Sequence, residues 1–166
     1  RVAVMNEGEL EQVGQSNDVY NFPQTPFVAT FVGENNAFHC KVISTEKDFV
    51  KVDFDGVHFF AKAGGDNKKN HNFKKGQEVI LFIRPESIFI RDKSNKFDNN
   101  FSAKLKTIEF EGNLKNIYLN LNSKMDVRFS VPNAVDTSNL SLNKEVDLTF
   151  SSSKAVVLPS GPLAVD

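Results

Sequence analysis

The first 33 residues of the chain carry more apolar surface than they can bury by themselves. Arg1-Val-Ala-Val-Met5 predicts a strand, and the turn Asn6-Glu-Gly8 reverses it into a second strand, Leu10-Glu-Gln-Val13. A two-stranded unit of this size is marginally stable at best in water. We therefore expect this segment to pack on something else, either the rest of a larger protein of which this chain is a piece, or a partner.

Two short helices are predicted between residues 16 and 33. Ser16 can cap the first helix, and Phe22-Pro23 ends it. Thr25 can cap the second helix, with Pro26 at its first position, where a missing N–H costs nothing. Gly33 supplies the left-handed residue that stops it.

From Glu34 onward the apolar period changes from helical to two, which is typical of strands. The predicted strands are Val50–Gly56, Val57–Ala61, Val79–Arg84, Ser87–Arg91, Phe101–Phe110, Leu114–Leu121, Met125–Val131, Val146–Phe150 and Ala155–Leu158. Many short strands separated by Gly or Asn turns predict a mainly β fold, either a small barrel or a sandwich.

A weak internal echo links two of these turns. Asp53-Phe-Asp-Gly56 and Glu109-Phe-Glu-Gly112 share an acidic-Phe-acidic-Gly pattern. A common turn requirement explains the pattern, because Gly accepts a positive φ and the acids face solvent. A duplicated barrel unit is the alternative explanation.

Composition narrows the classes of partner. The formal net charge is −1, so wholesale attraction to nucleic acid or anionic lipid is not expected. The single Cys40 excludes an intrachain disulfide and fits a reducing compartment. No stretch approaches the roughly 18 consecutive apolar residues of a membrane span, so direct membrane insertion is not expected.

Several fixed spacings together resemble one family. They are Arg1-Val-Ala-Val-Met-Asn-x-Gly-x-x-x-Gln-x-Gly14, Val19-Tyr-x-x-Pro23 and Phe27-Val-Ala-x-Phe-Val-Gly33. This order resembles the end of the ATPase domain in ATP-binding subunits of ABC importers, in the branch that handles polyamines, ferric iron and sugars. Ile83-Arg-Pro-Glu86 and Phe110-x-Gly112 are similar to the accessory β-domain of that branch, called TOBE.

The resemblance implies two regions. Residues 1–33 would be the tail of a truncated ATPase core, and residues 34–166 would form a TOBE-like barrel, or paired barrels, of the oligonucleotide/oligosaccharide-binding type. The phosphate loop of the ATPase needs a Gly-Lys pair, and the sequence contains none. The chain itself is therefore not expected to hydrolyse ATP or to hold a cofactor; ATP and Mg would belong to the full-length parent.

The resemblance also implies partners: the ATPase core of the same protein, a second ATP-binding subunit in a homodimer, and transmembrane permease subunits. The chain would then lie in the cytoplasm, peripheral to the inner membrane through the permease. Its predicted function is regulation and dimerisation of the ATP-binding subunit. Two alternatives stay open, a domain that senses a solute or an oxyanion, and a stand-alone nucleic-acid-binding module.

Three groups of residues are candidates for these roles. The docking face for a missing core or partner is predicted at Val2, Val4, Phe27 and Phe31. The polar joint Gly33-Glu34-Asn35 is predicted as a linker or hinge. A ligand or interface site is predicted at Arg84, Glu86, Lys74 and Lys75, where Arg84 could reach a carboxylate or an anion.

Two further patterns favour ordinary structural roles. His39 and Cys40 are neighbours on a strand, so they point to opposite faces and cannot easily chelate one metal ion. His58 and His71 have no ligand spacing that would complete such a site. The basic stretch Lys68–Lys75 is most simply a solvated loop, although contact with an anionic ligand is the alternative.

Overall fold

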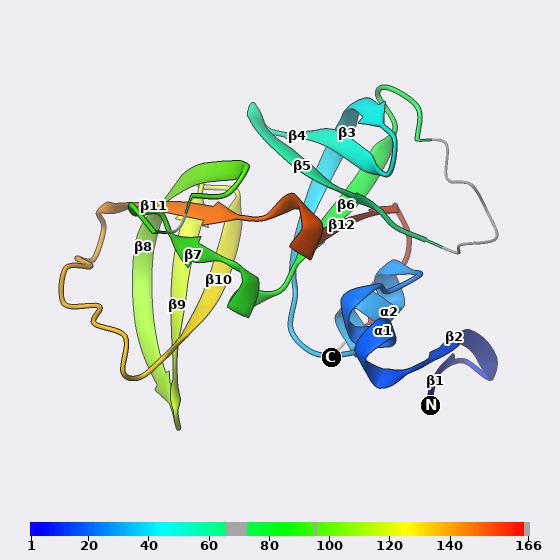
Figure 1. Ribbon diagram of the computed structural model, residues 1–166, viewed down its shortest axis with the longest axis horizontal. Helices are drawn as coiled ribbons and strands as arrows, with labels where there is room; N and C mark the ends of the chain where they lie inside the picture. Colours follow the sequence, from blue (N-terminus) through cyan, green and yellow to red (C-terminus); the bar gives the residue numbers. More distant parts are fainter. Residues whose placement is uncertain (66–72, 95, 165–166) are drawn as a thin grey trace. The chain divides into compact units, whose positions relative to one another are not determined.

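The computed structural model of the chain describes residues 1–65, 73–94 and 96–164 (Figure 1). The chain forms two compact units. The first comprises Arg1–Ile83 and Ser152–Asp166, and the second comprises Arg84–Ser151. The first unit is therefore built from both ends of the chain, and the second is inserted between them.

The N-terminal segment has the predicted hairpin and both predicted helices. Strand β1 (Val2–Asn6) pairs antiparallel with β2 (Glu9–Gly14). Helices α1 (Ser16–Asn21) and α2 (Pro26–Phe31) follow. Thr25 caps α2 as predicted, because its side chain accepts a hydrogen bond from the Val28 N–H at 3.3 Å.

The start of α1 differs from the prediction. Gln15 occupies the N-cap position and makes no side-chain cap, so the predicted Ser16 cap is wrong. The reason is that Ser16 already lies in the first helical turn, where its hydroxyl does not precede the free N–H groups. At the end of α2, Gly33 has a φ of 78°, as its predicted left-handed role requires.

Five strands of the first unit close into a barrel. They are β3 (Asn36–Glu46), β4 (Phe49–Phe54), β5 (Val57–Ala63), β6 (Glu78–Ile83) and β12 (Ala155–Pro159), in the order β12-β5-β4-β3-β6. Strand β12 closes the barrel because it pairs parallel with β5 on one side and antiparallel with β6 on the other. Alternate residues fill the interior, among them the fully buried Phe38, Val52 and Phe59.

The second unit is a five-stranded sheet. After a 3-10 turn, η1 (Pro85–Ser87), its strands are β7 (Phe89–Ile90), β8 (Asn99–Glu111), β9 (Leu114–Leu121), β10 (Met125–Pro132) and β11 (Glu145–Phe150). Their order is β10-β9-β8-β11-β7. The strand predicted over Ser87–Arg91 is shortened to two residues, because Pro85 starts a 3-10 turn that continues through Ser87.

The two units repeat one topology. The order β5-β4-β3-β6 in the barrel corresponds to β10-β9-β8-β11 in the sheet, and β3 and β8 each carry a bulge at the same point of the pattern. In each unit the fifth strand follows the fourth strand of the other unit. Strand β6 leads through η1 to β7, and β11 leads through the 3-10 turn η2 (Ser152–Lys154) to β12. The prediction of a mainly β fold with a barrel or paired barrels is confirmed.

The residues that suggested a duplication do not coincide with it. Gly56 lies in the turn between β4 and β5, whereas Gly112 lies in the turn between β8 and β9. These hairpins are not equivalent in the repeated topology. Both glycines have a positive φ, so the shared turn requirement explains the echo, and the duplication has a different origin in the sequence.

Candidate coupling site around the second helix

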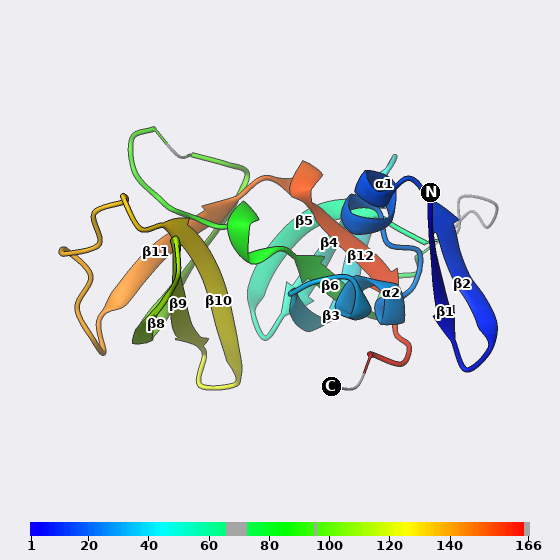
Figure 2. The same cartoon turned by 90° about the horizontal axis from the view of Figure 1, so that it is seen from below.

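Helix α2 buries two consecutive residues against two different bodies. Val28 packs with Val4 and Val19 of the N-terminal segment, and Ala29 packs in a cluster of barrel residues that includes Ile80 and Phe82. Both Val28 and Ala29 are fully buried. Successive helical residues point about 100° apart, so one short helix can serve two partners. Helix α2 is thus the packed connection between the N-terminal hairpin and the barrel (Figure 2).

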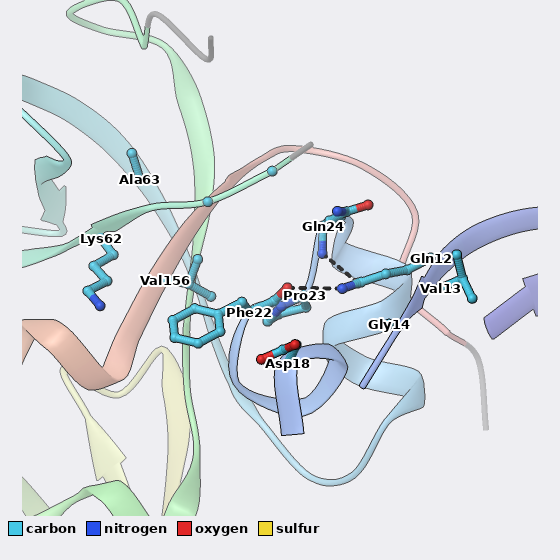
Figure 3. Close-up of a pocket in the computed structure, with 12 residues that line it drawn as sticks. Gln12, Val13, Gly14, Asp18, Phe22, Pro23, Gln24, Lys62, Ala63 and Val156 are labelled. Carbon is cyan, nitrogen blue, oxygen red and sulfur yellow. Dashed lines mark hydrogen bonds between the residues drawn. The ribbon is translucent and has the colours of Figure 1, made fainter. Parts of the chain in front are cut away.

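The turn before α2 is hydrogen-bonded to side chains of strand β2. The side chain of Gln12, which is only 6% exposed, donates from Nε2 to the Phe22 carbonyl at 3.1 Å. Its Oε1 accepts from the Gln24 N–H at 2.9 Å (Figure 3). The Thr25 hydroxyl donates to Glu11 Oε2 at 2.8 Å. These bonds satisfy buried polar groups and hold the hairpin and the start of α2 in one arrangement.

A cleft of about 420 Å³ separates part of the N-terminal segment from the barrel. Phe22 and Asp18 line one wall, and Lys62 with Ala63 lines the other (Figure 3). The Lys62 ammonium lies 5.2 Å from the centre of the Phe22 ring, a cation–π contact across the cleft. The cleft therefore has one apolar surface and one charge of each sign on its walls.

The predicted hinge, Gly33-Glu34-Asn35, is tied to the helix that it follows. Asn35 Nδ2 donates to the Ala29 carbonyl at 2.7 Å, which satisfies one of the last carbonyls of α2. The next residue, Asn36, is buried and donates to the Ile83 carbonyl at 3.2 Å. The segment thus connects α2 to β3 through specific hydrogen bonds.

The predicted docking face is divided by the structure. Val2 and Phe31 are exposed, and Phe27 is half-buried and stacks on Phe31 with 5.4 Å between ring centres. Val4 is 2% exposed because Val19 and Val28 cover it. Val4 is therefore a core residue of this segment.

A different apolar face of the hairpin is open. Ala3 pairs with Val13 and Met5 pairs with Leu10 across the two strands, and all four side chains are exposed. Strand alternation could have indicated Ala3 and Met5, since they lie opposite to Val4. A bulge between Val4 and Met5 shifts the register, so the pairing with Leu10 and Val13 required the structure.

The predicted ligand residues lie at two ends of one strand. Lys74 and Lys75 are exposed in the turn before β6, whereas Arg84 directly follows β6 and Glu86 lies in η1. A six-residue strand spans roughly 20 Å, so the structure does not bring the two pairs together. Arg84 is 6% exposed, which suits a structural role at the strand end. Lys68, Lys69 and His71 lie outside the described residues.

His39 and Cys40, which were considered together for metal binding, occupy ordinary strand positions. His39 is exposed and Cys40 is buried, so they face opposite sides of β3 as alternation requires. Burial raises the pKa of the Cys40 thiol to about 12 and keeps it protonated. Within residues 1–65, 73–94 and 96–164, no three His, Cys, Asp or Glu side chains gather to hold a metal ion.

Comparison with known proteins begins with a family model. The model of the TOBE domain matches residues 81–158, a span that contains the second unit together with most of β12. The fold agrees with a solved structure of the cytoplasmic molybdate-binding protein ModG with molybdate bound, at a TM-score of 0.61. That match covers 75% of this chain and 96% of the ModG chain at 18% identity, so it supports the fold alone. The fold is thus that of a TOBE-type domain.

Curated relatives make the assignment more particular. The spermidine/putrescine import ATP-binding protein of Trichodesmium erythraeum is 32% identical over 142 residues, which cover 82% of this chain and 36% of that protein. The protein of the same name from Onion yellows phytoplasma is 32% identical over 91% of this chain and 31% of its own length. These matches support a TOBE domain from an ABC importer ATP-binding subunit. The chain spans about a third of the length of the curated relatives that it matches.

No helix in the described part of the chain is long and apolar enough to cross a membrane.

Proposed function

We propose that this chain is the C-terminal regulatory region of an ABC importer ATP-binding subunit, and that α2 transmits changes between the ATPase core and the TOBE barrel. The observation that carries this proposal is the burial of Val28 against the N-terminal segment and of Ala29 against the barrel. A displacement of either body then moves α2, because close-packed residues have no free volume to absorb it.

In this proposal residues 1–33 are the last elements of the ATPase core, and residues 34–166 are the accessory domain. The exposed hairpin face, Ala3, Met5, Leu10 and Val13, is the surface that rests on the core. Four exposed apolar side chains that are cross-strand neighbours favour burial against another protein surface. This face replaces Val4 in the predicted docking set, and the exposed Val2 and Phe31 stay in that set as separate contacts.

The partners and the solute follow from the relatives. The subunit would pair with a second copy of itself and with transmembrane permease subunits, which would hold it at the cytoplasmic face of the inner membrane. The names of the relatives favour import of spermidine and putrescine. ATP and Mg would bind the core and not this region.

The first test is the reading frame that encodes the chain. Sequencing of the codons upstream of Arg1 should reveal an open frame that encodes Gly-x-x-x-x-Gly-Lys-Ser/Thr. A stop codon directly upstream would contradict the division of the chain into core tail and accessory domain.

The second test separates coupling from catalysis in the full-length subunit assembled with its permease. The Ala29→Glu substitution places a charge in the contact between α2 and the barrel. We expect spermidine uptake into vesicles to fall at least about fivefold while the subunit keeps its ATPase activity. The matched control is Ala134→Glu, since Ala134 is exposed in the second unit. Equal uptake by both variants would contradict the coupling role.

A third test concerns the oligomeric state. Light scattering of the 166-residue chain should give the mass of a dimer if the accessory domain pairs with its copy. Saturable heat in titrations with polyamines, phosphate or molybdate would instead favour the sensing alternative.

A further inference from the structure

The C-terminal residues beyond the barrel return to the helix near the other end of the sequence. After β12, the segment Ser160–Ala164 runs along α2, and the Ala164 N–H donates to the Thr30 hydroxyl oxygen at 2.8 Å. Leu163 is partly buried against the cluster that contains Ala29. Gly161 lies so near to Pro26 that an added Cβ would be 3.5 Å from Pro26 Cγ. The segment is thus hydrogen-bonded to Thr30 and lies close to Pro26 and to the cluster that contains Ala29.

The Thr30 hydroxyl connects this segment to the helix backbone. It lies 3.0 Å from the Pro26 carbonyl and 3.2 Å from the Phe27 carbonyl, to which it donates, and it accepts from Ala164. A threonine hydroxyl has one donor and two acceptor positions, so one side chain can make both kinds of bond at once. The hydrogen bond from Ala164 therefore requires a hydroxyl-bearing side chain at position 30.

Helix α2 needs such support. It has six residues, and an isolated helix of this length is unstable in water because nucleation costs more than one turn of hydrogen bonds returns. Its order therefore depends on its neighbours: Val4 and Val19 on one side, the barrel on another, and the C-terminal segment along a third. Loss of one neighbour should release the helix locally while the barrel strands stay paired.

We propose that Ser160–Ala164 is a strap whose closing holds α2 on the barrel and whose opening frees the N-terminal segment. A cavity of about 390 Å³ lies beside the strap, lined by α2 residues Thr30 and Phe31, by Gly33-Glu34-Asn35, and by Leu163 and Ala164. The strap is thus packed on one side and open on the other, and it can leave α2 without displacing a barrel strand. This device is a property of the 166-residue chain and holds whether or not the chain acts in an importer.

Hydrogen exchange of the 166-residue chain tests the strap. The reporters are the Ala29 and Val32 N–H groups, which donate to the Thr25 and Val28 carbonyls in α2 and its two caps. Thr30→Val removes the hydroxyl at almost constant shape, and we expect exchange in α2 to rise about tenfold or more. Thr30→Ser is the matched control, since it keeps the hydroxyl and should stay within about threefold of the wild type. Amides of β9 should not change in either variant.

A second variant keeps the test decisive if Thr30→Val disturbs the helix directly. Deletion of residues 160–166 removes the strap and leaves every residue of α2 and of the barrel strands in place. The strap predicts the same rise in α2 exchange, with protection of β3 to β6 retained. Unchanged α2 exchange in the deletion variant would overturn the strap. Reduced spermidine uptake by Ala29→Glu could still stand in that case, so the two proposals fail separately.

Discussion

The barrel and the sheet share one order of four strands but differ in their fifth strand. In the barrel the fifth strand, β12, has five residues and pairs with both of its neighbours. In the sheet the corresponding strand, β7, has two residues and pairs with β11 alone among the described strands. Both strands enter after a 3-10 turn, and both come from a connection that leaves the other unit.

The two fifth strands also differ in how much apolar surface they bury, and so in how much they stabilise their units. Val157 and Leu158 of β12 are fully buried, whereas Phe89 of β7 is 38% exposed. Burial of a large aliphatic side chain contributes about 1.5–3 kcal/mol. The barrel therefore depends strongly on a strand that arrives late in the sequence, while the sheet gains little from its own fifth strand.

Removal of β12 should have the largest effect. Truncation after Ser151 deletes the strand that closes the barrel and exposes the edges of β5 and β6. We expect amides of residues 36–63 to lose exchange protection, because several buried side chains are lost at about 1.5–3 kcal/mol each. Two-dimensional NMR of the truncated chain checks this, with addition of a peptide of residues 152–164 as the rescue control. If the amides of β3 and β4 stayed protected from exchange, the barrel would not depend on β12 and the contrast with the sheet would be wrong.

A smaller cut compares the two fifth strands directly. Leu158→Ala should destabilise the barrel by about 2–5 kcal/mol, because it leaves a cavity at a fully buried site. Phe89→Ala should destabilise the sheet by about 1 kcal/mol, because solvent already reaches the ring. Urea denaturation followed by exchange in each unit measures both values, and equal costs would remove the distinction between β12 and β7.

The buried thiol of Cys40 should make the folding stability of the barrel fall at high pH. The equivalent interior position of the sheet has no group that ionises. Cys40 in β3 corresponds to Ala103 in β8, since each lies two residues before the last inward residue that precedes the bulge. Burial raises the pKa of the folded thiol to about 12, above the ordinary value of about 8.5 for a free thiol, so the thiol of the unfolded chain loses its proton first as the pH rises. This contribution is complete below about pH 9 and falls as the pH rises toward 12, by about 1.4 kcal/mol per pH unit at most.

The control for this dependence is Cys40→Ala, which gives β3 the residue that β8 has. Denaturation midpoints between pH 8 and pH 10.5, about the range in which a free thiol ionises, should decline more steeply for the wild type than for the variant. Parallel curves would mean that the thiol is not desolvated in the folded barrel.

The smallest loss of stability is expected when a charged side chain on the outer face of the sheet is removed. Lys106 Nζ lies 2.6 Å from Asp126 Oδ2, and this hydrogen bond is the main cause that lowers the pKa of Asp126. Both side chains are about half exposed, so Lys106→Ala should cost less than about 1 kcal/mol. The small loss should shrink further as salt is added, which urea denaturation at two ionic strengths can detect. A loss as large as that of Leu158→Ala would show that the sheet is held by its polar face.

The sequence allowed local structure to be predicted where one residue type has one strong preference. Thr25-Pro26 and Gly33 have such preferences, so the limits of α2 were predictable. The repeat was predicted from the wrong turns. Its true signal is Phe38-x-Cys-Lys-Val42 against Phe101-x-Ala-Lys-Leu105, two inward-facing runs that each end at a bulge. The match was hidden because the large and small interior side chains exchange positions between the two units. Phe59 and Ala61 of β5 correspond to Val127 and Phe129 of β10.

The candidate site depended more on tertiary contacts. Val4 and Met5 are both apolar, and only the packing of Val19 and Val28 determines which of the two is covered. The role of Ala29 has no signal in the sequence, because a small residue on a helix fits many neighbours. The contact between Ala164 and Thr30 joins residues 134 positions apart, which no local preference can predict.

The central claim is that α2 holds the N-terminal segment on the barrel as one body. Spin labels at Glu9 of β2 and Asp55 of the β4–β5 turn, both exposed, measure this directly in a Cys40→Ala background. Pulsed electron paramagnetic resonance should give a single narrow distance distribution for this chain and a broad one after Ala29→Glu. A distribution equally broad with Ala29 intact would contradict the account.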